Sequence, residues 1–249
     1  MKQNIEISPK YASLEPLISE IADHGVPSDA KLIYKGRNRV FSLSRNSTEL
    51  SIKAFRKPRF LNAYIYGSVR KSKARRSYEY AARLLSLGIG TPEPVAYIEN
   101  YDNGRLMESY YICLQVDGHT VRDWERLPDS QPLIDALARE MVRMHRAGVF
   151  HKDFSPGNIL YTIDDGGAYH FYHIDLNRME FGIVDRAKLM RNFRAIHLDM
   201  EQTLRLARAY ARAAGVDAEN TSSEAEKQVK AYRSEKTVHK FFKNLFRHG

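Results

Sequence analysis

The sequence predicts an α+β fold in which a small antiparallel β part precedes a mainly helical part. Three short strand-like runs, separated by polar turns, follow one another within residues 31–55. Two longer runs with apolar residues at helical spacing occupy residues 132–147 and 198–214. We therefore divide the chain into an N-terminal extension (1–27), a β-rich part (28–116) and a helical part (117–249), the last two forming one domain.

The composition indicates an anionic partner. The 249 residues carry a formal net charge of +9, which favours binding to phosphates, acidic sugars or an anionic membrane surface. No nucleic-acid-binding motif stands out, so we do not expect nucleic acid as a partner. The single cysteine, Cys113, excludes an internal disulfide and suits a reducing cytoplasm. We find no apolar run long enough to span a bilayer and no signal peptide.

The first 55 residues contain one expected helix and three expected strands. A short amphipathic helix is expected from Ser13 to Ala22. The strands are Lys31–Tyr34, Val40–Ser44 and Glu49–Phe55.

The turn between the first two strands contains Gly36 and Arg37. Backbone N–H groups and an arginine in such a turn can meet phosphates. A plain surface hairpin explains the same residues equally well.

The third strand carries Lys53 between the apolar residues Ile52 and Ala54. A lysine that is buried there needs a partner for its charge. The helix expected from Ser77 to Leu87 supplies Glu79, the only acidic residue between Lys53 and Gly90. A solvated lysine at a sheet edge is the simpler explanation, but an inward Lys53 would pair with Glu79.

The densest basic region lies between that strand and that helix. Basic residues are interleaved there with aromatic and aliphatic ones, a mixture that suits an anionic bilayer or a phosphorylated lipid head group. A solvated basic face explains the pattern equally well. The candidate substrate-binding residues are Arg56, Lys57, Arg70, Lys71, Lys73, Arg75 and Arg76.

Two further strands, Val95–Ile98 and Ser109–Gln115, lead to a hinge-like stretch at Asp117. The helix Pro132–Ala147 follows, with a buried apolar stripe on which His145 is expected to be a satisfied core residue.

The most specific pattern follows that helix. His151, Asp153 and Asn158 form the skeleton H-x-D-x-x-x-x-N, and Asp175 ends a short apolar strand. This is the spacing of a kinase catalytic loop and its metal-binding aspartate. Residues 159–161 and 169–174 are expected to pair as antiparallel strands, which would bring Asn158 and Asp175 to the same edge.

Phosphoryl transfer explains these residue types. A carboxylate must lie beside the acceptor hydroxyl, and oxygen ligands must hold Mg²⁺. We therefore predict that ATP and Mg²⁺ are used, with Asp153 facing the acceptor hydroxyl and Asn158 and Asp175 holding the metal. Lys53, steadied by Glu79, would hold the inner phosphates of the nucleotide.

The hinge-like stretch Val116–His119 is expected to pair with adenine through its free backbone groups, and Gln115 and Asp117 are the candidate nucleotide contacts there. After Asp175 the chain is expected to become helical, with a helix from Leu198 to Ala214. A polar loop, Asp217–Glu224, precedes the last helical segments. The aromatic and basic end, His239–His248, would pack on the domain or touch a membrane.

Lys53, Glu79 and the runs His151–Asn158 and Ile174–Arg178 together resemble the bacterial lipopolysaccharide kinases, a family of Kdo kinases and core-heptose kinases. The likeness covers roughly residues 31–210. It implies a protein-kinase-like two-lobed fold, with a small antiparallel β N-lobe and a mainly helical C-lobe. It also implies ATP-dependent phosphorylation of a sugar hydroxyl, on Kdo or a core heptose, in the inner core of a lipid A precursor.

The resemblance further implies a location at the cytoplasmic face of the inner membrane, where the enzyme would be peripheral. In this family Asp153 corresponds to the catalytic base and Lys53 to the phosphate-holding lysine. An anionic glycolipid substrate would also agree with the positive charge of the chain.

Three departures from protein kinases argue against a protein substrate. Ser155 stands where those enzymes have a lysine, Asn177 replaces the usual glycine, and no A-P-E segment follows Asp175. A soluble small-molecule phosphotransferase, an atypical protein kinase of the RIO kind and a non-catalytic nucleotide-binding scaffold remain as alternatives. The basic surplus opposes the first, and the presence of all the expected polar residues opposes the last.

Overall fold

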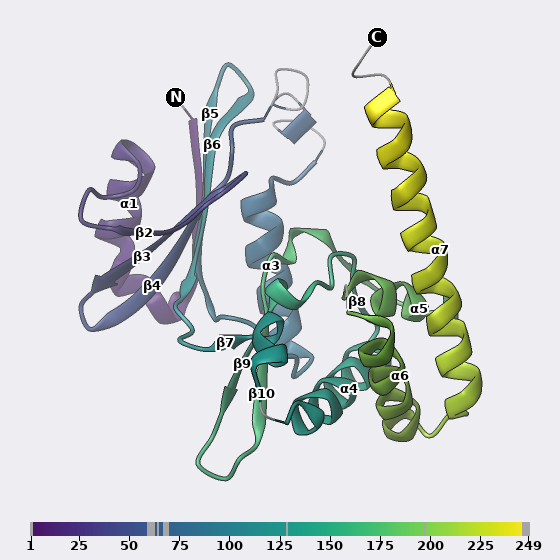
Figure 1. The fold of residues 1–249 in the computed structure, drawn as a ribbon. Coiled ribbons are helices and arrows are strands. Elements are labelled where there is room, and N and C mark those ends of the chain that lie inside the picture. The colour runs from purple at the N-terminus through teal and green to yellow at the C-terminus, as the bar shows by residue number, and fades with distance from the viewer. Residues whose placement is uncertain are drawn as a thin grey trace. The chain divides into compact units, whose positions relative to one another are not determined.

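The computed structural model describes residues 2–58, 63, 65, 66, 70–127, 129–196 and 198–245, apart from the side chains of residues 125, 126 and 235–245. The chain has an α+β architecture with two compact units (Figure 1). The first unit holds residues 1–117 and 173–177, and the second holds residues 118–172 and 178–249.

The first unit is built on a six-stranded antiparallel sheet. Its strands are β1 (Lys2–Ile7), β2 (Lys31–Lys35), β3 (Arg39–Arg45), β4 (Thr48–Ala54), β5 (Pro94–Asp102) and β6 (Arg105–Leu114). Their order in the sheet is β1-β5-β6-β4-β3-β2. The five strands expected from the sequence are confirmed, and β5 and β6 extend further than expected because a short turn at Asn103 and Gly104 joins them.

Residues 1–27, which the sequence analysis set apart as an extension, belong to the first unit. Strand β1 pairs with β5, with Ile5 opposite Ile98. A 3-10 helix, η1 (Pro9–Leu14), then leads to helix α1 (Glu15–His24), which begins two residues later than expected. Helix α1 buries Ile18 and Ile21 in the hydrophobic core beneath the sheet.

Helix α3 (Lys73–Ser86) covers the opposite face of the sheet (Figure 1). Residues of β5 alternate between the two faces of the sheet. Ile98 packs in the core with α1, whereas the ring of Tyr97 packs edge-on against the ring of Tyr78 on α3, with 5.4 Å between the ring centroids. Helix α3 begins four residues earlier than expected. Its start is fixed by Ser72, whose side chain accepts a hydrogen bond from the Arg75 N–H.

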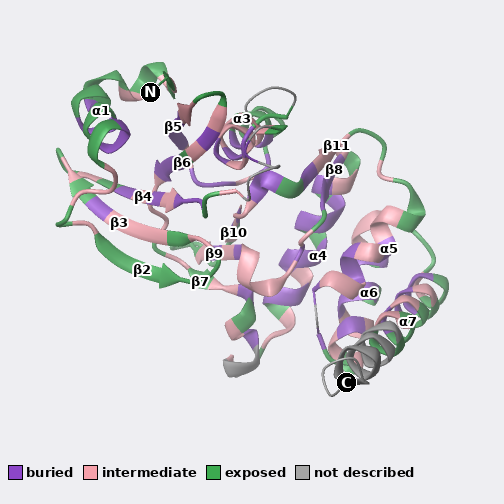
Figure 2. Ribbon diagram, turned by 90° about the horizontal axis from the view of Figure 1, so that it is seen from above, coloured by how far each residue is buried: buried purple, intermediate pink, exposed green. Residues whose placement is uncertain are grey.

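The second unit is mainly helical. Its helices are α4 (Gln131–Arg146), α5 (Arg186–Ala195), α6 (Met200–Ala214) and α7 (Ala218–Leu245), with the 3-10 helices η2 (Val121–Arg126) and η3 (Pro156–Asn158) between them. A further 3-10 helix, η4 (Leu176–Arg178), has its first two residues in the first unit. Two small sheets accompany them. One is the three-stranded sheet β10 (Tyr169–His173), β9 (Ile159–Ile163) and β7 (His119–Thr120), and the other pairs β11 (Met179–Phe181) with β8 (Val149–His151). Figure 2 shows buried residues gathered on β5, β6 and α4.

The prediction of a polar loop at residues 217–224 is wrong, because α7 begins at Ala218. The Asp217 side chain accepts a hydrogen bond from the Asn220 N–H at 2.6 Å and so caps the helix. Thr221, Ala225 and Val229 are buried at intervals of four residues, which gives this polar sequence one packed stripe. The aromatic and basic end at residues 239–248 lies outside the described side chains.

Within the described part of the chain, none of the helices has both the length and the apolar character that crossing a membrane requires.

Replacing Ile21 by alanine tests whether α1 contributes to the core of the first unit. Ile21 is fully buried, so the substitution should lower the free energy of unfolding by about 2–5 kcal/mol in urea denaturation. Ile33→Ala on β2, where the side chain is 46% exposed, is the matched control and should cost less than about 1 kcal/mol. Equally small effects at both positions would mean that α1 contributes little to the stability of the first unit.

Candidate active site

The loop that carries Asp153 is held between two buried aromatic side chains. His151 ends β8 and Phe154 follows Asp153, and both side chains are fully buried. The Asp153 N–H donates to His151 Nδ1 at 3.1 Å, and the Asp153 carbonyl accepts from the side-chain amide of Asn158 at 2.9 Å. The Asp153 carboxylate stays 42% exposed, with a guanidinium nitrogen of Arg178 at 3.8 Å. The loop thus fixes the backbone of Asp153 and leaves its carboxylate accessible.

Two glycines fix the point at which this loop begins. The Gly182 N–H donates to the Gly148 carbonyl at 2.8 Å, next to the paired strands β8 and β11. Gly148 has a φ of +71°, and a Cβ at this position would lie 2.5 Å from the Gly182 carbonyl oxygen. Only glycine accommodates both the left-handed backbone and the close approach.

Asn192 on α5 joins helix α4 to the loop that carries Asp153. Its Oδ1 lies 2.9 Å from His145 Nε2, and its Nδ2 donates to the His151 carbonyl at 2.9 Å. His145 also meets the Tyr210 hydroxyl through Nδ1 at 3.2 Å, which confirms it as a satisfied core residue. No sequence pattern singles out Asn192, because its burial depends on how α5 packs.

His145 is a neutral group in this network. Burial lowers the pKa of its ring, although the hydrogen bond to Asn192 acts in the opposite direction. Both ring nitrogens of the neutral imidazole are engaged, one by Asn192 and the other by Tyr210. His145 therefore acts on the Asp153 loop through Asn192 and is not a reacting group.

Lys53 forms an ion pair with Asp175. The alternation of β4 places Lys53 on the face of the sheet opposite to Ile52, which packs in the core with α1. Lys53 Nζ lies 2.9 Å from Asp175 Oδ1, and the two side chains are 18% and 30% exposed. The same Asp175 oxygen accepts a hydrogen bond from Asn177 Nδ2 at 2.6 Å. Lys53 is therefore an inward, paired lysine, as the sequence suggested.

The segment His173–Asn177, which carries Asp175, is part of the first unit. The His173 N–H donates to the Gly90 carbonyl at 2.9 Å, and the Thr91 hydroxyl donates to the His173 carbonyl at 2.8 Å. At the other end of the segment, the Arg76 guanidinium donates to the Asn177 carbonyl at 2.9 Å. Asp175 itself has a φ of +58°. Its position is thus fixed from both sides by the sheet unit.

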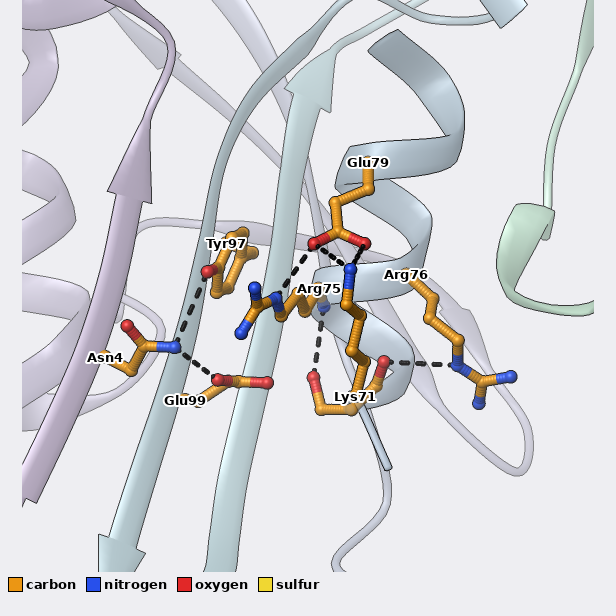
Figure 3. A network of polar contacts seen from close by, with 8 residues as sticks. Asn4, Lys71, Arg75, Arg76, Glu79, Tyr97 and Glu99 are labelled. Atoms are coloured by element: carbon orange, nitrogen blue, oxygen red, sulfur yellow. Dashed lines mark hydrogen bonds and ion pairs between the residues drawn. The ribbon is translucent and has the colours of Figure 1, made fainter. Parts of the chain in front are cut away.

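The expected pairing of Glu79 with Lys53 is wrong in this structure. Glu79 binds Lys71 at 2.7 Å and Arg75 at 2.9 Å (Figure 3). Burial acts to raise the pKa of Glu79, but the hydrogen bonds from Lys71 and Arg75 outweigh it and hold the pKa below its ordinary value. The physical reason is local: Arg75 lies one turn earlier on the same helix and Lys71 just precedes it, so the charge of Glu79 is already compensated.

The candidate basic residues separate into two groups. Arg56, Lys57 and Lys73 line a cavity of about 440 Å³ in the first unit, together with Arg37 from the β2–β3 turn. The other four contact neighbours near α3: Lys71 and Arg75 bind Glu79, Arg76 binds the Asn177 carbonyl, and Arg70 lies over the ring of Tyr66. Residues 59–62, 64 and 67–69 of the basic region lie outside the described residues.

The expected nucleotide contacts are partly corrected. The Gln115 N–H donates to the Glu49 carbonyl at 2.8 Å, so this amide extends the sheet and is not available to adenine. The Gly36 N–H is used inside its own turn, where it donates to the Asn38 carbonyl at 3.1 Å. Asp117 is exposed at the end of the first unit.

The donor atoms of Asn158 and Asp175 fit Mg²⁺, which prefers oxygen ligands. Because the amide nitrogen of Asn158 binds the Asp153 carbonyl, its remaining polar atom is an oxygen. Asn158 directly precedes β9, and Asp175 lies two residues beyond its neighbour β10. Asn158 belongs to the second unit and Asp175 to the first, so their joint coordination of a metal stays a prediction.

Known proteins resemble this chain in sequence and in fold. A family model described as the lipopolysaccharide kinase (Kdo/WaaP) family matches residues 55–232. A solved structure of WaaP in complex with acyl carrier protein is 20% identical, with a TM-score of 0.59, and the match covers 93% of this chain and 99% of that one.

Two structures of Rio2 kinase from Chaetomium thermophilum, one of them an ADP/Mg²⁺–phosphoaspartate complex, are 16% identical with a TM-score of 0.52. These matches cover 90% of this chain and 77% or 79% of theirs. No curated protein matches the sequence. At these identities the solved structures show the fold alone, and they confirm the expected protein-kinase-like α+β fold.

A double-mutant cycle tests the partner of Lys53. Combining Lys53→Met with Asp175→Asn should give a coupling free energy of about 1 kcal/mol in urea denaturation, at the lower end for contacting residues because the pair is partly exposed. Lys53→Met combined with Glu79→Gln is the matched control, and its effects should add to within about 0.5 kcal/mol. A larger coupling with Glu79 than with Asp175 would restore the pairing expected from the sequence.

The partly buried His145 should make stability depend on pH. Because burial lowers its pKa, the folded state keeps the ring neutral while the unfolded chain takes up a proton below a pH of about 6.5. Its contribution to the free energy of unfolding is therefore complete above that pH and is lost as the pH falls. Denaturation between neutral pH and about pH 5 should show a shallower decline for His145→Gln than for the wild type.

Tyr210→Phe is the control for this measurement, since it removes a contact of His145 and keeps the titrating ring. It should retain the decline of the wild type. Identical slopes for His145→Gln and the wild type would contradict the assignment of His145 as a neutral, partly buried group.

Proposed function

Because this chain belongs to the lipopolysaccharide kinase (Kdo/WaaP) family, we propose that it transfers the γ-phosphoryl group of ATP to a sugar hydroxyl of a lipid A precursor. The family makes the chain a kinase of the lipopolysaccharide core. The acceptor in this proposal is Kdo or a neighbouring core heptose.

The observation that carries the proposal is the geometry of the Asp153 loop. A base for an acceptor hydroxyl needs a fixed position and an accessible carboxylate. Burial of His151 and Phe154 supplies the fixed position, and the exposed carboxylate of Asp153 supplies the access. In the proposed reaction Asp153 accepts the proton of the sugar hydroxyl as its oxygen bonds to the γ-phosphorus of ATP, while the bond from that phosphorus to the bridging oxygen breaks and ADP leaves.

Lys53 and Asp175 take the roles that handle the phosphates. Lys53 lies on the central strand β4, and its ammonium group pairs with the Asp175 carboxylate. When a nucleotide binds, Lys53 would contact a phosphate and Asp175 would bind the metal ion. Asn158 and Asp175 would hold Mg²⁺ through their oxygens. When bound, Mg²⁺ neutralises charge that develops on the transferred phosphoryl group.

The net charge of +9 supports an anionic acceptor. Lipid A carries phosphates and Kdo carries a carboxylate, whereas the substrates of aminoglycoside or choline phosphotransferases are cationic. A basic protein that acts on such a glycolipid is expected to work at the cytoplasmic face of the inner membrane, as a peripheral protein.

Mass spectrometry of the acceptor tests this function. Purified protein incubated with ATP, Mg²⁺ and a Kdo-bearing lipid A precursor should add one phosphoryl group to the sugar. Parallel incubations with a heptose-bearing precursor, with soluble amino alcohols and with a general protein substrate identify the acceptor class. Phosphorylation of only a soluble alcohol or a protein would refute the proposal.

Asp153→Asn should lower kcat by about 10²–10⁴-fold, because it removes the base and leaves the loop intact. Nucleotide affinity, measured by equilibrium binding, should stay close to that of the wild type. The matched control is Asp165→Asn, which neutralises an exposed carboxylate in the β9–β10 turn and should keep full activity. A fully active Asp153→Asn variant would show that another group is the base.

A further inference from the structure

The cavity of about 440 Å³ in the first unit has an unusual lining. Arg37, Arg56, Lys57 and Lys73 supply four cationic side chains, and none of the described residues that line the cavity is acidic. The rest of the lining is the hydroxyl of Ser109 with the aromatic and apolar side chains of Phe55, Pro58, Tyr66 and Leu106. A hydrogen bond from the Arg56 N–H to Asn38 Oδ1, at 3.2 Å, joins the chain after β4 to the turn that carries Arg37.

These four cations differ from three basic residues near them, which have carboxylate partners. Lys53 is paired with Asp175, and Lys71 and Arg75 are paired with Glu79. Within the part of the chain that the structure describes, no carboxylate forms an ion pair with the side chain of Arg37, Arg56, Lys57 or Lys73. The positive charge of the cavity is therefore compensated by no direct ion pair, and Asp175 acts on Lys73 only through its charge at longer range.

The start of α3 adds to this charge. Lys73 is the first residue of the helix, and the first turn contains no acidic residue. The N-terminal end of a helix carries a partial positive charge, so a lysine here is unfavourable for stability. Burial lowers the pKa of Lys73, and the charge of Arg37 lowers it further, although the charge of Asp175 acts in the opposite direction. An electrostatically costly cluster of this kind is expected where an anion binds.

We propose that this cavity binds a phosphate or carboxylate group of the glycolipid acceptor. The inference rests on the proposed function, and it assigns the anchoring of the acceptor to Arg37, Arg56, Lys57 and Lys73. The four cations meet the anionic group, with the arginines offering paired N–H donors. The aromatic and apolar lining contacts the hydrocarbon surface beside that group.

The mixed lining favours the acceptor over the nucleotide as the source of the anion. The phosphates of ATP have the paired Lys53 as their proposed partner, and a nucleotide phosphate chain offers no apolar surface to Phe55 and Leu106. A phosphorylated or acidic sugar next to acyl chains offers both kinds of surface.

Equilibrium binding separates the two sources. The variant Arg56→Gln/Lys73→Gln removes two cations from the cavity, and Lys31→Gln/Lys227→Gln removes two exposed cations elsewhere. Affinity is measured for a Kdo-bearing lipid A precursor in detergent micelles and for a non-hydrolysable ATP analogue with Mg²⁺. The cavity variant should lose roughly tenfold in glycolipid affinity for each cation removed, since each supplies a charge-assisted contact that is partly screened. Its nucleotide affinity should match that of the control variant.

An equal loss of nucleotide affinity would assign the cavity to ATP, and an unchanged glycolipid affinity would leave it without this role. Either result overturns the proposal. Retained nucleotide binding also shows that the variant is folded. Because these are binding measurements, they decide the proposal even if the wild type transfers no phosphate to the glycolipid, the result that would refute the proposed function.

The same variants identify the anionic group. One glycolipid lacks the lipid A phosphates, and another has its Kdo carboxyl converted to a methyl ester. If the cavity variant and the control bind one of these glycolipids equally, the missing group is the one that the cavity holds. A difference that persists with a glycolipid lacking both groups would contradict anion binding by the cavity.

Discussion

The ion pair between Lys53 and Asp175 is the interaction on which the candidate active site depends. It joins residues 122 positions apart in the sequence. An ion pair that is partly exposed contributes little stability by itself. Here it acts together with the backbone hydrogen bonds of His173 and Asn177, which tie the same short segment to the sheet unit. Several weak contacts thus determine the position of one carboxylate.

Asp153 is positioned by a different physical means. Its own side chain makes few contacts, and the rigidity comes from its neighbours. His151 and Phe154 are buried on either side of it, and Asn192 holds the His151 carbonyl from helix α5. Burial of these neighbours fixes the backbone of Asp153 and leaves its carboxylate exposed. Contacts made directly to the carboxylate would fix it as well but would cover it.

Much of this site followed from local sequence rules. The alternation of β4 placed Lys53 on the face away from the α1 core, and the spacing from His151 to Asn158 specified a loop of fixed shape. The errors arose where distant packing decides the outcome. Strand β1 has only two apolar residues and forms because β5 offers it an edge. Helix α7 has a polar start that is stabilised by one buried stripe. The error at Glu79 is instead local: the prediction paired it with Lys53, whereas the nearer cations Lys71 and Arg75 compensate its charge.

The close backbone contact between Gly148 and Gly182 shows that two different constraints act on this chain. Asp153 is required by chemistry, whereas Gly148 is required by space, since any side chain there would collide with the Gly182 carbonyl. A descendant of this protein that abandoned phosphoryl transfer would be free to replace the aspartate but would still need the glycine. The glycine three residues before the histidine therefore reports on the backbone geometry of the loop, and the aspartate reports on whether catalysis has survived.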